Sequence, residues 1–200
     1  MAIIFSRVSI RLSYLFAHTS ITPNQLTMLS TFAAILAAAL IQWSTYYIRI
    51  AGILIWFLAY VLDFCDGEIA RYRNMQTEFG HWLDVVSDRL KDVALFTAVT
   101  LLAVRESQST IAVLTGLLAL GGTMVYTYSL SASDQGKEFD DISPDRFGNA
   151  NYVLMAILIV LDRPIIFLCL VALVTFAGLS LKFHSARRKL ARCDPNTRCI

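Results

Sequence analysis

Residues 63–88 read DFCDGEIARYRNMQTEFGHWLDVVSD and place four aspartates inside a sequence that is otherwise largely apolar. An almost purely apolar run at residues 50–62 precedes this stretch, and a second apolar run follows at residues 93–104. Carboxylates at the ends of such segments are costly to desolvate, so partners, cavity water or bound cations usually neutralise them. The stretch therefore predicts a polar site carried by two apolar helices.

Helical spacing sorts the acidic and small residues of this stretch into two stripes. The first stripe consists of Asp63, Asp66, Gly67 and Ala70. The second consists of Gly80, Asp84 and Asp88. Two helices that face each other along these stripes bring the carboxylates together, and the glycines allow a backbone or a ligand to approach closely. Oxygen donors without Cys or His favour Mg²⁺ or Mn²⁺ over zinc.

The spacing D-x2-D-G-x2-A-R-x8-G-x3-D-x3-D resembles the signature of the CDP-alcohol phosphotransferase family, integral membrane enzymes that build phospholipid head groups. Every fixed position of the signature is met, by Asp63, Asp66, Gly67, Ala70, Arg71, Gly80, Asp84 and Asp88. A motif with this many fixed positions is far more specific than a lone aspartate pair. The resemblance extends over the whole chain in layout and is strict over residues 63–88.

The resemblance implies metal-dependent transfer of a phospho-alcohol group from a CDP-alcohol, such as CDP-diacylglycerol, to a hydroxyl of a polar acceptor, with release of CMP. Two divalent cations, Mg²⁺ or Mn²⁺, would be held by Asp63, Asp66 and Asp84. Asp88 would be the catalytic base and would also touch a metal. The nucleotide-binding wall would consist of Gly67, Ala70, Arg71 and Gly80.

Two further candidate site residues rest on weaker resemblances to the family. The run ITPNQLT resembles the usual opening of the family's first helix, which makes Thr27 a candidate nucleotide contact, although its hydroxyl could equally bond its own backbone. Members that bind inositol phosphate often carry an R-x2-R pair at the fifth helix, where this chain has Arg146 followed by Asn149. Arg146 is therefore either an acceptor contact, for inositol phosphate or glycerol phosphate, or a cationic anchor at the membrane surface. Lys91 and Asp92 extend the third-helix face and either line the cavity or meet the interface.

The composition is that of an all-α integral membrane protein. Hydrophobic residues make up 56% of the chain and charged residues only 16%, whereas soluble domains carry about 25% charged residues. A spanning helix needs about 20 apolar residues, so one domain over residues 1–200 with a bundle of six transmembrane helices at 22–183 is expected. The expected helices cover residues 22–43, 50–71, 80–104, 110–130, 146–161 and 164–183.

The two ends of the chain carry additional signals. Residues 1–20 place apolar side chains on one helical face and basic side chains on the other, which predicts an amphipathic helix in the membrane interface or a cytoplasmic helix packed on the bundle. Residues 184–200 are expected to form a basic cytoplasmic tail. With six spans, only three of the 17 Lys and Arg residues fall on the side opposite the termini, namely Arg49, Arg105 and Arg163. The positive-inside rule therefore places the termini and the aspartates in the cytoplasm.

Three other interpretations remain open at this point. The aspartates could form a structural network with Arg71, Arg73 and Arg89. A divalent-cation transporter would also use a carboxylate site, and a membrane prenyltransferase would use Mg²⁺ with aspartate-rich helices. The net charge of +2 is too small to indicate nucleic-acid binding. The family likeness raises a homodimer as one arrangement, and the CDP-linked donor is expected to come from another polypeptide or a further domain.

Overall fold

The structure, a computed structural model, describes residues 14, 16, 19–43, 45–134 and 144–192. These residues form helices and contain no strand, which confirms the all-helical prediction. The helices are α2 (Pro23–Ile41), α3 (Tyr46–Tyr72), α4 (Glu78–Ser107), α5 (Thr110–Asp134), α6 (Pro144–Val160) and α7 (Pro164–Arg192). The predicted interfacial helix at residues 1–20 lies almost entirely outside the described residues.

The helix order matches the prediction, but some ends differ. Helix α3 begins at Tyr46, directly after its N-cap residue Thr45 and four residues before the predicted start at residue 50. Helix α7 continues to Arg192, through much of the segment predicted to be a basic tail. The sequence beyond residue 183 is rich in Ala, Leu, Arg and Lys, which are the strongest helix formers. Their propensity extends the helix past the end of the apolar run.

Polar caps fix the helix ends that surround the aspartates. Thr22 and Gln25 form a reciprocal capping box at the start of α2, with Pro23 at the first helical position. Thr77 caps α4 by accepting a hydrogen bond from the Gly80 amide at 3.0 Å. Between α3 and α4, Asn74 adopts a left-handed backbone conformation with φ of 53°. These features reverse the chain so that α4 runs back along α3.

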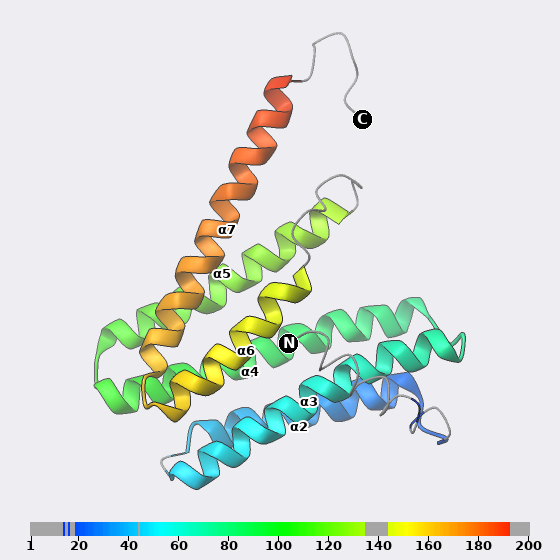
Figure 1. The fold of residues 1–200 in the computed structure, drawn as a ribbon, viewed down its shortest axis with the longest axis horizontal. Helices are drawn as coiled ribbons and strands as arrows, with labels where there is room; N and C mark the ends of the chain where they lie inside the picture. Colours follow the sequence, from blue (N-terminus) through cyan, green and yellow to red (C-terminus); the bar gives the residue numbers. More distant parts are fainter. Residues whose placement is uncertain (1–13, 15, 17–18, 44, 135–143, 193–200) are drawn as a thin grey trace.

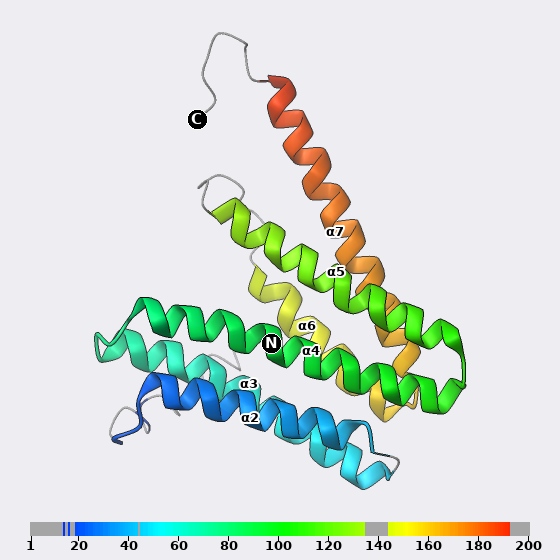
Figure 2. The same ribbon diagram turned by 180° about the vertical axis from the view of Figure 1, so that it is seen from behind.

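Figure 1 shows α2, α3 and α4 running side by side, with α5 and α7 paired and inclined across α4. Figure 2 shows the same arrangement from behind, where α2 lies against both α3 and α4. The main core joins these layers through buried apolar residues of α2 to α7. A second, smaller core cluster ties α2 to α3 beside the aspartates and consists of Leu26, Leu62, Cys65 and Ile69.

Four helices of the described chain are long and apolar enough to cross a membrane: Pro23–Ile41, Tyr46–Tyr72, Thr110–Ser129 and Pro164–His184. Many large apolar side chains on these helices face outward, such as Leu117 and Leu173, which are 62% and 66% exposed. Helix α4 is not among these four helices because charged residues interrupt its first half. They include Asp84, Asp88, Arg89, Lys91 and Asp92. Helix α6 is only 17 residues long.

Gly52 is the point of closest approach between α2 and α3. A Cβ atom at this position would lie 2.9 Å from both the Ala37 carbonyl oxygen and the Ile41 amide nitrogen. Both atoms belong to the α2 backbone, so neither can swing aside. Only glycine therefore permits this contact between the first half of α3 and the second half of α2.

We expect Gly52→Ala to push α3 away from α2 and to lower the free energy of unfolding by about 1–3 kcal/mol, the usual effect of overpacking. The matched control is Gly121→Ala, because a Cβ atom at Gly121 has nothing within 4 Å, and its effect should stay within about 0.5 kcal/mol. Thermal unfolding in detergent measures both. Equal stability of the two variants would contradict the close-packing argument.

Candidate metal centre between two cavities

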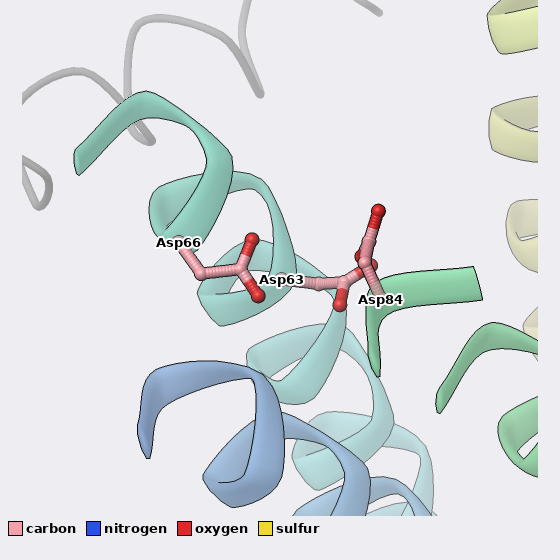
Figure 3. Close-up of side chains that lie close together, drawn as sticks. All are labelled: Asp63, Asp66 and Asp84. Carbon is pink, nitrogen blue, oxygen red and sulfur yellow. The ribbon is translucent and has the colours of Figure 1, made fainter. Parts of the chain in front are cut away.

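Three of the four predicted aspartates converge at one point. Asp63 and Asp66 lie one turn apart on α3, and Asp84 reaches toward them from α4, as Figure 3 shows. One carboxylate oxygen from each residue lies within 4.8 Å of the others. Three carboxylates from two helices form an all-oxygen donor set of the kind that Mg²⁺ and Mn²⁺ prefer. The donor set therefore fits the metal that the sequence predicts.

Helix α2 supplies polar partners for two of these carboxylates. The buried Thr27 hydroxyl donates to Asp66 Oδ2 at 2.5 Å and lies 3.1 Å from the Pro23 carbonyl oxygen. The Ser30 hydroxyl donates to the Thr27 carbonyl oxygen at 2.8 Å and lies 3.4 Å from Asp63 Oδ1. The backbone contact predicted as one alternative for Thr27 is present, the contact with Asp66 is an addition that the sequence analysis did not foresee, and the nucleotide contact stays a prediction. The position of Ser30 near Asp63 was not predicted either, because nothing in the stretch 63–88 points to it.

Asp88 lies outside the three-carboxylate cluster but faces the same cavity. Its Oδ1 lies 3.4 Å from the Lys91 ammonium, which also forms an ion pair with Asp63. Arg89 pairs instead with Asp92 at 3.1 Å, and Arg73 donates to the Ile21 carbonyl oxygen. Among the ion pairs of the described residues, the cation paired with these carboxylates is Lys91, which the alternative network of three arginines did not include.

The residues predicted to bind the nucleotide line one cavity of about 270 Å³. They are Thr27, Gly67, Ala70, Arg71 and Gly80. At Gly80 a Cβ atom would lie only 3.1 Å from Asn24 Oδ1 and from Thr77 Oγ1. The glycine thus keeps the wall of this cavity open where α2 and α4 come together.

A larger cavity of about 530 Å³ lies on the other side of the carboxylates. Asp66, Gly67, Arg71 and Asp84 line both cavities, so the cluster sits where the two meet. Four polar residues of the larger cavity come from three helices: Arg89, Asp92, Thr127 and Tyr152. Asp92 therefore lines the cavity, which was one of its two predicted positions. Thr127 and Tyr152 were not identified, because both lie outside the motif and only the packing of α5 and α6 brings them to this cavity.

Arg146 lies in the first turn of α6, but its side chain is outside the described part of the structure. Its predicted contact with the acceptor stays a prediction.

A family model described as CDP-alcohol phosphatidyltransferase matches residues 20–179, which include all four aspartates. The match covers most of the chain, so this protein belongs to the CDP-alcohol phosphatidyltransferase family. The family resemblance inferred from the motif is thereby confirmed. Together with its four apolar helices, the family identifies the chain as an integral membrane protein.

Two curated relatives illustrate the range of the family. The chain is 39% identical over 80 residues to the bifunctional IPC transferase and DIPP synthase of Aquifex aeolicus, covering 40% of this chain and 18% of the relative. It is 30% identical over 124 residues to the phosphatidylinositol phosphate synthase of Mycobacteroides abscessus, covering 62% of this chain and 56% of the relative. The matched segments thus span less than two thirds of either relative.

The fold is similar to that of a solved structure, the phosphatidylinositol phosphate synthase PgsA1 of Mycobacterium tuberculosis. Its crystal structure with CDP-DAG bound gives a TM-score of 0.72 at 18% identity, over 89% of this chain and 92% of that chain. Its complex with manganese and citrate gives a TM-score of 0.69 at 18% identity, over 88% and 87%. At this identity the likeness establishes the shared fold.

We expect Thr27→Val to weaken Mn²⁺ binding about tenfold, because the hydroxyl that orients Asp66 is lost, and such outer contacts tune metal affinity. Thr27→Ser should restore the affinity. The matched control is Thr31→Val, since the Thr31 hydroxyl donates to the Thr27 carbonyl oxygen and not to a carboxylate. Isothermal titration of the detergent-solubilised protein with Mn²⁺ measures the change. Equal losses in Thr27→Val and Thr31→Val would contradict the role of the Asp66 contact.

Proposed function

We propose that this protein transfers a phospho-alcohol group from a CDP-alcohol, such as CDP-diacylglycerol, to a hydroxyl of a polar acceptor and releases CMP. The observation that carries this proposal is the position of the carboxylate cluster, at the junction of a cavity lined by the motif's small residues and a larger cavity. A reaction with two substrates needs such a junction. Support comes from the family and from one fold relative, whose crystal structures include a complex with CDP-DAG and a complex with manganese and citrate.

In this proposal Asp63, Asp66 and Asp84 hold two divalent cations, Mg²⁺ or Mn²⁺, with Asp88 touching one of them. When bound, such a pair neutralises the pyrophosphate of the donor and the charge that develops during an in-line displacement. Asp88 acts as the base. Its carboxylate takes the proton of the acceptor hydroxyl while the acceptor oxygen bonds to the β-phosphorus. The bond from that phosphorus to CMP breaks, and CMP leaves with the bonding electrons.

The smaller cavity is the proposed nucleotide site. Gly67, Ala70 and Gly80 leave room for the cytidine, and the Arg71 guanidinium can pair with phosphate oxygens from its position between the two cavities. Thr27 shapes the same cavity while holding Asp66.

The larger cavity is the proposed acceptor site. Arg89 donates to Thr127 at 2.7 Å and pairs with Asp92, so α4 and α5 present a connected polar wall beside the carboxylates. Such a wall suits the hydroxyls of a polyol, and inositol phosphate and glycerol phosphate are the proposed acceptors. Arg146 is the proposed partner of the acceptor phosphate. Two relatives named phosphatidylinositol phosphate synthase and IPC transferase support an inositol-based acceptor.

The proposed topology follows from the charge distribution. All six helices would span the membrane within one domain over residues 1–200, with an interfacial helix at 1–20. The termini and the aspartates would face the cytoplasm, because the basic residues gather on that side. A homodimer is part of the same proposal. The family membership favours this transferase over a cation transporter or a prenyltransferase.

We expect purified protein to release CMP from CDP-diacylglycerol only when Mg²⁺ or Mn²⁺ and a suitable acceptor are present. Asp88→Asn should lower kcat by about 10²–10⁴, the usual contribution of a general base. The control is Glu78→Gln, which changes an exposed carboxylate on the same helix that lines neither cavity. Testing inositol phosphate, glycerol phosphate, inositol and serine identifies the acceptor. Absence of CMP release and of CDP-alcohol binding would contradict the proposed function, and cation flux in liposomes would then test the transporter.

We expect Asp92→Asn to raise the KM for the acceptor about three- to tenfold, the effect of losing one net hydrogen bond, and to leave the KM for the donor unchanged. Steady-state CMP release with each substrate varied in turn measures both constants, again with Glu78→Gln as control. A rise in the donor KM alone would place the acceptor elsewhere.

A further inference from the structure

Lys91 is a buried ammonium group inside the carboxylate site. The residue is only 8% exposed and lies on α4, one turn beyond Asp88. Its Nζ forms ion pairs with Asp63 Oδ1 and, at 3.4 Å, with Asp88 Oδ1. A buried ammonium is costly unless anions surround it, so these two carboxylates determine where the Lys91 side chain rests.

The two partners of Lys91 have different positions relative to the metal centre. Asp63 belongs to the three-carboxylate cluster, whereas Asp88 lies outside it. A cation between these two residues is therefore adjacent to the cluster and shares Asp63 with it. In the proposed function Asp88 would touch one of the two divalent cations, so a cation shared by Asp63 and Asp88 would correspond to the second of them. The ammonium of Lys91 stands in that place.

The charges of these side chains limit how many divalent cations the site can hold before the donor binds. One divalent cation added to four carboxylates and one ammonium leaves the site with a net negative charge, whereas a second divalent cation makes the site net positive. Like charges a few ångströms apart repel strongly in a poorly solvated bundle. The pyrophosphate of a CDP-alcohol would bring the negative charge that a second cation needs.

We propose that Lys91 is an internal cation that occupies the second divalent-cation position, between Asp63 and Asp88, until the donor arrives. The inference rests on the proposed function, because it assumes a divalent cation at the three-carboxylate cluster. The first cation binds this cluster without displacing Lys91. The second cation binds together with the donor pyrophosphate, and the Lys91 ammonium then leaves Asp63 and Asp88.

The test is a count of bound Mn²⁺ by electron paramagnetic resonance on the whole protein in detergent. The wild-type protein should bind one tight Mn²⁺ per chain without donor and two with CDP-diacylglycerol, with the spin-coupled signal of adjacent ions. Lys91→Met should bind two without donor, the second at least about tenfold more tightly than in the wild-type protein. The control is Lys182→Met. This variant removes a lysine of α7 that lies over the ring of Tyr126 on α5, and it should not change the number of bound Mn²⁺ ions.

Thermal unfolding provides a second measurement. In EDTA, Lys91→Met should unfold at a lower temperature than the wild-type protein, because Asp63 and Asp88 lose their cation, and Mn²⁺ should raise its Tm by more than that of the wild type. Two tight Mn²⁺ ions in the wild-type protein without donor, or one in Lys91→Met, would overturn the inference while metal-dependent CMP release still supported the function. If neither protein bound Mn²⁺, both proposals would fail.

Discussion

The central constraint of this structure is the crowding of carboxylates at the ends of apolar helices. Asp63, Asp66 and Asp84 bring oxygen atoms within 4.8 Å of one another, and such a group persists only where neighbouring atoms offset its charge. The chain provides that offset from both flanking helices. Helix α2 contributes hydroxyl donors, and α4 contributes the Lys91 ammonium. The close contact at Gly52 packs the other halves of α2 and α3 together.

Helix α4 carries charge at both of its ends, and the two groups serve different purposes. Near its end, Glu106 pairs with the buried Arg49 of α3 at 3.2 Å, and Arg49 also pairs with Asp162 in the turn between α6 and α7. This network fastens three parts of the bundle at the end opposite the carboxylate site. The same helix thus presents acidic residues to a proposed ligand at one end and to an arginine at the other. The charges of Arg49, Glu106 and Asp162 therefore have a structural role.

The sequence predicted the parts of this protein that depend on local spacing. The two stripes in residues 63–88 follow from helical periodicity, and the caps at Thr22 and Pro23 follow from residue type. Contacts between helices were harder to predict from the sequence. Lys91 meets Asp63 across 28 positions of sequence, and this contact depends on the register of α3 against α4, which no motif specifies. Thr127 and Tyr152 join the larger cavity for the same reason, since only the packing of α5 and α6 brings them to it.

The division of the site into two cavities has a consequence for specificity. The smaller cavity is built by α2, α3 and the start of α4, which contain the whole of the family motif. The larger cavity adds residues of α5, α6 and α7, outside that motif. In the proposed function the motif therefore serves the nucleotide and the metal, which every CDP-alcohol donor shares. In the same proposal the acceptor is recognised by α4 together with α5 and α6, which contribute Thr127 and Tyr152 from outside the motif. A motif can thus define the reaction class while leaving the acceptor to be determined by the packing of the remaining helices.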